Sequence, residues 1–207
     1  MILTDLISKG DVREVYRHPD NADLCVKIDY VQGHYARKRK TSAQIKYYRW
    51  LEQRAAPFDM MTRFHGCIDT NFGRGYVFDL IRDDGGAVAR PITDYFHSSE
   101  FTETHYQSIL GNLRAYRRYF IDNRIIGPSS HLPNNVYALG ATKGTGRLFS
   151  IDSLGANEFV SVFSLNKHLA GYKANRKWRR LIRSMSVRWR RNGVLQEILR
   201  DSEVWLV

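Results

Sequence analysis

The chain has 207 residues, which is enough for one large domain or two small lobes around a hydrophobic core. Its apolar content of 43% is typical of a folded globular protein, and no apolar run approaches the length of a membrane-spanning helix. Lys167–Arg191 holds ten Lys or Arg and no Asp or Glu, so this one segment accounts for nearly all of the net charge of +11. The N-terminus is too polar for a signal peptide, and these features together predict a cytoplasmic protein.

The first segments of the chain are predicted to form strands. Asp5–Ser8, Arg13–Tyr16 and Leu24–Asp29 have strand-like composition and are separated by turn residues. Lys27 lies inside the third segment with apolar neighbours on both sides, which indicates a lysine in a buried strand; the alternative is an exposed Lys on an edge strand. The following segment, Arg37–Arg54, has apolar residues at helical spacing on one face and basic residues opposite, and it predicts a helix.

A polar, glycine-containing break divides the predicted elements into two groups. Met60–Thr70 and Gly75–Ile81 are expected to form another strand pair, and Arg82–Gly86 follows as a flexible hinge. We therefore expect residues 1–82 to form a β-sheet lobe with one helix. Residues 83–207 are expected to form a helical lobe that contains a hairpin and the basic C-terminal helix.

Two amphipathic helices are predicted in the second half. Thr102–Asn123 repeats apolar residues at helical spacing, and they should face the core. Asn175–Arg191 combines an apolar stripe with many arginines. The stripe is expected to close the lobe core while the arginines are solvated. Alternatively, residues 167–191 could bind an anionic partner, namely a membrane surface, a phosphorylated glycan or a nucleic acid.

A hairpin with polar residues at both ends is the central feature of the sequence. Val136–Leu139 and Arg147–Ile151 are short apolar runs that flank a loop rich in turn residues. Because a hairpin returns its outer ends to one edge, Asn135 and Asp152 should lie near each other. An amide oxygen and a carboxylate suit Mg²⁺, with phosphate and water as its remaining ligands. The alternative is that Asn135 caps a turn and Asp152 ends an ordinary strand.

This hairpin resembles the catalytic core of protein kinases, in which such residues hold the metal ions of ATP. The resemblance implies that Asn135 and Asp152 are metal ligands and that ATP and Mg²⁺ are the cofactors. Ser130 falls where the catalytic Asp of a kinase lies, and a serine cannot be the carboxylate that deprotonates an attacking hydroxyl. The neighbouring His131 is a candidate for a substitute base.

The same resemblance extends to the N-terminal half. Gly10 is the single glycine in the turn that corresponds to the loop over the phosphates. Lys27 corresponds to the lysine that grips the α- and β-phosphates. Gln44 takes the helical position of the Glu that pairs with this lysine in kinases, although an amide supplies no charge.

The order of the motifs also looks like that of the bacterial YrbL-type family of the PhoP regulatory network, which responds to low magnesium and is similar to kinase-fold proteins. The motifs are Tyr16-Arg-His-Pro19, Val26-Lys-Ile28, Lys46-Tyr-Tyr-Arg-Trp-Leu51, Gly73-Arg-Gly-Tyr-Val-Phe-Asp79, Asp122-Asn-Arg-Ile125, Ser130 with Pro133 and Asn135, and Asp152 with Gly155. The resemblance implies an α+β, two-lobed, protein-kinase-like fold whose helical C-terminal lobe is truncated.

Two functions are consistent with these observations. The first is a nucleotide-sensing pseudokinase or regulator in the bacterial envelope or magnesium-stress response, which binds ATP and Mg²⁺ without the usual catalytic Asp. The alternative is an atypical ATP-dependent phosphotransferase that acts on a small or anionic substrate. Nucleic-acid binding through the basic helix alone is a third hypothesis, but no recognised nucleic-acid motif accompanies the charge.

Overall fold

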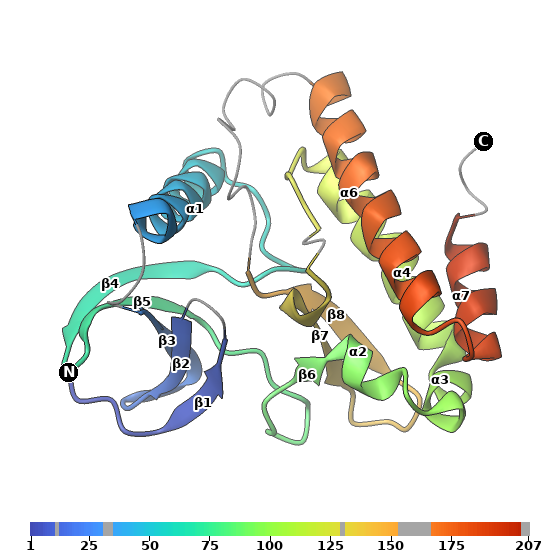
Figure 1. Ribbon diagram of the computed structural model, residues 1–207, viewed down its shortest axis with the longest axis horizontal. Coiled ribbons are helices and arrows are strands. Elements are labelled where there is room, and N and C mark those ends of the chain that lie inside the picture. The colour runs from blue at the N-terminus through green and yellow to red at the C-terminus, as the bar shows by residue number, and fades with distance from the viewer. Residues whose placement is uncertain (11–12, 31–34, 129–130, 153–166, 204–207) are drawn as a thin grey trace.

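The computed structural model describes residues 1–10, 13–30, 35–128, 131–152 and 167–203 (Figure 1). A curved antiparallel sheet with one long helix forms the N-terminal part, and most of the remaining residues form helices packed beside a small sheet. The predicted α+β architecture, with strands before about residue 82 and mainly helices after it, is confirmed.

The N-terminal sheet has five antiparallel strands in the order β1-β2-β3-β5-β4. These strands are β1 (Leu6–Lys9), β2 (Arg13–His18), β3 (Asn21–Asp29), β4 (Phe64–Thr70) and β5 (Gly73–Asp79). The hairpin between β4 and β5 turns at Gly73, whose φ of 93° lies in the left-handed region that glycine tolerates. The middle strand β3 pairs on both sides, so its C-terminal half, which includes Lys27, is buried.

A second sheet and the helices make up the rest of the described chain. The strands are β6 (Arg90–Pro91), β7 (Asn135–Leu139) and β8 (Gly146–Ser150), and they pair in that order. The helices are α1 (Tyr35–Gln53), α2 (Ile92–Tyr95), α3 (Ser99–Thr104), α4 (Tyr106–Asp122), the 3-10 helix η1 (Leu132–Asn134), α6 (Lys167–Arg188) and α7 (Gly193–Glu203). The predicted hairpin of β7 and β8 is present, with Asn135 as the first residue of β7.

Two details of the helices differ from the sequence-based expectation. The predicted helix Thr102–Asn123 is broken at His105, which ends α3 and stacks on the Phe101 ring at a centroid distance of 3.8 Å. Helix α7 was not predicted; with α4 and α6 it packs into one layer of helices (Figure 1).

The apolar stripe of the basic helix closes the core, as expected. Its large residues are all buried: Trp178, Leu181, Ile182, Met185 and Trp189. They belong to the main hydrophobic cluster, which also includes residues of α1, α4 and β5. Within the described part of the chain, no helix has the length and apolar character needed to cross a membrane.

Hydrogen bonds link helix α1 and the segment after it to the helical part of the molecule. Three hydrogen bonds connect α1 and the segment after it to α4 and the residues that follow α4: the Ile126 amide donates to the Tyr47 hydroxyl, the Tyr119 hydroxyl donates to the Pro57 carbonyl, and the Arg54 guanidinium donates to the Asn123 carbonyl. The aromatic rings of α1 also join the main core, and Tyr48 and Leu51 are fully buried.

A short backbone connection positions the end of the hairpin beneath the N-terminal sheet. Met61 forms a parallel bridge with Ser150, the last residue of β8. The Thr62 amide donates to the Ser150 carbonyl at 3.0 Å, and the Ser150 amide donates to the Met60 carbonyl at 3.0 Å. Ile151 and Asp152, which follow β8, contact Lys27 of β3 and Arg13 of β2.

Candidate functional site

Lys27 lies at the junction between the two parts of the molecule. Its side chain is almost completely buried, with 4% of the residue exposed. The ammonium Nζ donates a hydrogen bond to the Ile151 carbonyl oxygen at 2.6 Å and lies 4.4 Å from the centroid of the Phe78 ring. The structure therefore brings Lys27 beside the chain segment that carries Asp152, as the sequence predicted, and a face of Phe78 adds a favourable cation–π contact.

Asp152 directs both carboxylate oxygens toward polar side chains of the N-terminal part. The Gln44 amide nitrogen donates to Oδ1 at 2.6 Å, and a terminal guanidinium nitrogen of Arg13 lies 3.5 Å from Oδ2. Gln44 was expected at the position of a residue that pairs with Lys27. Its contacts are instead with Asp152 and Arg13, since its Oε1 accepts a hydrogen bond from Arg13 at 3.4 Å.

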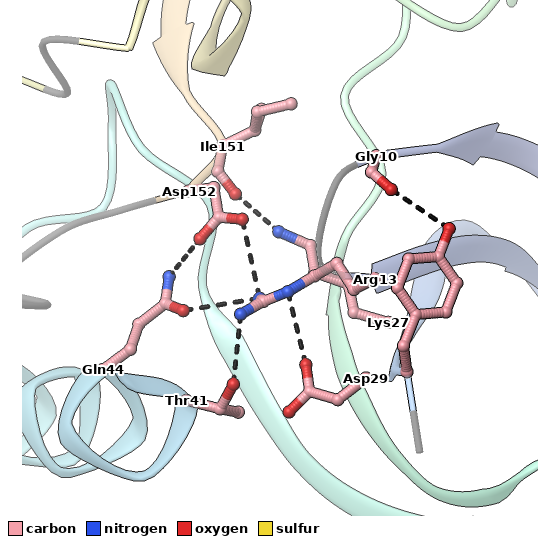
Figure 2. A network of polar contacts seen from close by, with 9 residues as sticks. Gly10, Arg13, Lys27, Asp29, Thr41, Gln44, Ile151 and Asp152 are labelled. Carbon is pink, nitrogen blue, oxygen red and sulfur yellow. Dashed lines mark hydrogen bonds and ion pairs between the residues drawn. The ribbon is translucent and has the colours of Figure 1, made fainter. Parts of the chain in front are cut away.

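Arg13 is the centre of this network (Figure 2). Its guanidinium lies 3.4 Å from an Asp29 carboxylate oxygen and donates to the Thr41 hydroxyl at 3.2 Å, in addition to the contacts with Gln44 and Asp152. Only 9% of Arg13 is exposed. We call Arg13, Lys27, Asp29, Thr41, Gln44 and Asp152 the polar cluster.

The polar cluster balances its own charge. Arg13 and Lys27 supply two positive charges, and Asp29 and Asp152 supply two negative charges. Burial of an unpaired charge is costly, whereas pairing with additional hydrogen bonds offsets much of the desolvation. The two carboxylates remain about one-fifth exposed, at 18% for the Asp29 side chain and 20% for the Asp152 side chain.

Sequence reasoning did not identify Arg13 as a residue of the site. A single arginine at the start of a strand is usually solvent-exposed. One signal was available, because the hairpin of β2 and β3 places Arg13 directly opposite Asp29. Opposite charges at facing positions of two strands attract each other, so this pairing indicates that the side chains meet.

Gly10 borders the site, and its backbone groups are already engaged. Its amide donates to the Arg13 carbonyl at 3.0 Å, which closes the turn, and its carbonyl accepts a hydrogen bond from the Tyr30 hydroxyl at 3.0 Å. A Cβ atom added at Gly10 would approach only the Arg13 carbonyl, at an ordinary distance of 3.5 Å. The structure thus brings Gly10 close to the polar cluster without a backbone conformation that demands glycine.

Asn135 lies inside the helical part and has no exposed surface. Its Oδ1 accepts a hydrogen bond from the Tyr116 hydroxyl of α4 at 2.9 Å, and its Nδ2 donates to the carbonyls of His131 and Leu132 at 3.1 and 3.2 Å. Burial raises the pKa of Tyr116 above its ordinary value, so this hydroxyl stays a neutral donor at physiological pH. Asn135 therefore holds the turn before β7, which is the alternative role considered from the sequence.

The oxygens expected to bind Mg²⁺ have protein partners in this arrangement, and their role as metal ligands stays a prediction. Magnesium needs oxygen ligands at about 2.0–2.1 Å in a nearly octahedral shell. The Oδ1 of Asn135 faces Tyr116, and the two oxygens of Asp152 face Gln44 and Arg13. Elsewhere in the described residues, no group of three or more His, Cys, Asp or Glu side chains is placed to hold a metal ion.

The two candidate catalytic residues precede η1. Ser130 lies outside the described residues. His131 is exposed, and its carbonyl oxygen accepts hydrogen bonds from the Asn134 amide and the Asn135 side chain. The backbone of His131 thus takes part in the turn, and a role of Ser130 or His131 in catalysis stays a prediction.

The arginines of α6 form a separate basic surface on the far side of its buried stripe. The exposed basic residues of this helix and the turn after it are Arg176, Arg179, Arg180, Arg183, Arg188, Arg190 and Arg191. Three large apolar side chains, Leu169, Tyr172 and Val187, are exposed on the same helix, at 43%, 67% and 69%. We call this set the arginine face.

Comparison with solved structures identifies the fold. Single- and double-mutant forms of the PknI kinase domain of Mycobacterium tuberculosis match with TM-scores of 0.49 and 0.50, each at 12% sequence identity. The match to the double mutant covers 95% of this chain and 86% of the PknI chain. The match to the single mutant covers 86% of this chain and 72% of the PknI chain. The chain has a protein-kinase-like fold. At this identity the similarity shows the fold alone.

Comparison of sequences identifies the family. Proteins from Escherichia coli strain K12 and Shigella flexneri, both described as "Uncharacterized protein YrbL", are 28% identical to this chain over 176 residues. The matches cover 85% of this chain and 82% of each relative. The family model described as "PhoP regulatory network protein YrbL" matches residues 3–186, which is nearly the whole chain. The chain therefore belongs to the YrbL family of PhoP regulatory network proteins.

Proposed function

We propose that this protein is a nucleotide-binding regulator of the pseudokinase type, which binds ATP at the polar cluster and serves the bacterial envelope or magnesium-stress response from the cytoplasm. The observation that carries the proposal is the position of Lys27, whose buried ammonium lies at the end of the hairpin beside Asp152. A buried lysine is costly unless it has partners, and a position between the two parts of a kinase-like fold suits a contact with phosphate.

The regulator is favoured over an enzyme because the features of phosphoryl transfer are incomplete. Ser130 offers no carboxylate at the position of the general base. Gln44 supplies no charge to Lys27, and the Gly10 amide is used within its own turn. The alternative, a phosphotransferase for a small or anionic substrate, depends on positioning alone or on His131 as a base.

Nucleotide binding is tested with the full-length chain by thermal shift in the presence of ATP, because a ligand that binds only the folded form raises the midpoint. Lys27→Met should weaken the affinity by at least about tenfold, the usual effect of losing a hydrogen bond to a charged group. Lys9→Met is the matched control, since Lys9 lies on the same sheet with an exposed side chain paired to Glu14. Failure of wild type to bind ATP, or equal effects of both substitutions, would contradict the proposal.

Measurement of ATP consumption separates the regulator from the enzyme. General-base assistance is worth roughly 10²–10⁴-fold, so Ser130→Asp should raise the turnover of a phosphotransferase that lacks only its base. For a regulator, wild type and Ser130→Asp should both stay at the background given by Asp152→Asn. A rise in the Ser130→Asp variant that Asp152→Asn abolishes would favour the enzyme.

The arginine face provides the second part of the proposal, a surface for an anionic partner within residues 167–191. Because the apolar stripe of α6 is buried, its exposed arginines are not needed to fill the core. Combined Arg179→Gln, Arg180→Gln and Arg183→Gln substitutions should reduce retention on a heparin column while the melting temperature stays unchanged. Unchanged retention would mean that these arginines are only solvated. Retention reports binding to a polyanion, and vesicle and RNA sedimentation then separate the membrane surface from nucleic acid.

A further inference from the structure

Arg13 occupies the position in which the carboxylate of Asp152 would meet a metal ion. Its guanidinium lies 3.5 Å from Oδ2 of Asp152 and shares Gln44 with the same carboxylate. We propose that Arg13 replaces the divalent cation on Asp152, so that the site binds its nucleotide without a metal. This inference rests on the proposed nucleotide binding and changes its expected cofactors from ATP with Mg²⁺ to ATP alone.

The surroundings of Arg13 show that this position is built into the fold. The guanidinium contacts side chains from three places in the chain: Asp29 on β3, Thr41 and Gln44 on α1, and Asp152 after β8. Figure 2 shows the guanidinium between these groups, with Lys27 reaching Ile151 from the same side. With 9% of Arg13 exposed, solvent has little access to the contact.

Electrostatics makes the guanidinium and a metal ion mutually exclusive on Asp152. The polar cluster is neutral, and a divalent ion on Asp152 would add two positive charges within a few ångströms of Arg13 and Lys27. Like charges brought together at a buried site repel strongly, which lowers the affinity for the ion. Coordination through Oδ1 would also remove the 2.6 Å hydrogen bond from Gln44.

The guanidinium performs one task of the metal, because it neutralises the Asp152 carboxylate, which would otherwise repel a nucleotide phosphate. Arg13 and Lys27 are the two cations of the polar cluster. Because the Arg13 guanidinium is directed at Asp29, Thr41, Gln44 and Asp152, it acts on a bound phosphate through its charge. Guanidinium is permanently charged, so this contribution is present at every physiological pH and magnesium concentration.

The direct test is the binding of Mn²⁺ to the full-length chain without nucleotide, followed by electron paramagnetic resonance. Mn²⁺ prefers the same oxygen ligands as Mg²⁺. Wild type should have no Mn²⁺ site at Asp152, so Asp152→Asn should leave the Mn²⁺ binding of the protein unchanged. Arg13→Gln should gain such a site, with an affinity at least about tenfold higher than that of wild type, because a repelling charge has been removed. Arg17→Gln is the matched control on the same strand and should behave as wild type.

Each outcome decides the proposal. An Asp152-dependent Mn²⁺ site in wild type overturns it, and so does an Arg13→Gln variant that folds but gains no site. A purely structural arginine would change only the melting temperature. If Arg13→Gln does not fold, Arg13→Lys retains the charge and should bind no Mn²⁺, and the wild-type measurement still discriminates.

Nucleotide binding supplies the second measurement and distinguishes this inference from the proposed function. Wild type should bind ATP in EDTA and in Mg²⁺ with affinities within about threefold of each other, whereas Arg13→Gln should bind only when Mn²⁺ or Mg²⁺ is present. A wild-type affinity that rises tenfold or more with Mg²⁺ overturns the metal-free site. If wild type binds ATP neither in EDTA nor in Mg²⁺, the proposed function is refuted. The Mn²⁺ measurement without nucleotide then still tests whether Arg13 excludes a metal ion from Asp152.

Discussion

Asp152→Asn should destabilise the protein by about 3 kcal/mol. The substitution keeps the shape of the side chain and removes the charge that faces Arg13 at 3.5 Å. At an effective dielectric constant of about 20, two unit charges at this distance interact by roughly 4–5 kcal/mol. Removing one partner of a buried pair costs about 3–5 kcal/mol. We take the low end of that range because 20% of the Asp152 side chain is exposed and solvent screens the pair.

The assay is thermal and urea-induced unfolding of wild type and variants. For a chain of this length, about 3 kcal/mol corresponds to a fall in melting temperature of roughly 6–12 °C. Asp5→Asn is the control, because Asp5 pairs with Arg17 at a shorter distance of 2.8 Å but both side chains are more exposed, at 60% and 37%. The control should cost about 0–1 kcal/mol. If Asp5→Asn lowered the free energy of unfolding as much as Asp152→Asn, the electrostatic reasoning would be refuted.

Two other predictions concern the helical part and high pH. Trp178→Ala should destabilise the protein by about 3–5 kcal/mol in urea unfolding, since Trp178 is 1% exposed in the core, whereas Tyr172→Ala on the exposed side of α6 should change stability by no more than about 0.5 kcal/mol. Burial raises the pKa of Tyr48 and Tyr116 above the ordinary value of 10.0, so the stability that they contribute is complete below pH 10 and is lost as the pH rises further. Tyrosinate absorbance of these residues should therefore appear together with the loss of circular dichroism above pH 10; gradual ionisation in a folded protein would contradict their burial.

The part of the fold that follows local rules was accessible from the sequence. Periodicity identified α4 and the buried stripe of α6, and turn residues identified the hairpin of β7 and β8. The position of Lys27 near Asp152 followed from the order of these elements. The break at His105 was missed because the apolar spacing continues across it, and helix α7 lay in a segment that received no assignment.

The partners of the site residues could not be predicted in the same way. Gln44 is 108 residues from Asp152 in the sequence, and Lys27 is 124 residues from Ile151. Which donor takes which carboxylate oxygen depends on how the sheet, α1 and the hairpin pack, and no local pattern encodes this choice. Arg13 was therefore not predicted to belong to the site, although it lies opposite Asp29 in the pairing of β2 with β3.

The position of α1 between the sheet and the helical part has a mechanical consequence. Hydrogen bonds of Tyr47, Arg54 and Tyr119 join α1 and the segment after it to the helical part, while the Tyr48 ring of α1 also packs against Phe78 of the sheet. Arg13 and Lys27 belong to the sheet, whereas Thr41 and Gln44 belong to α1 and Asp152 follows β8. A rotation of the sheet relative to α1 and the hairpin would therefore break several contacts of the Arg13 guanidinium at once, so the polar cluster resists separation of the two parts.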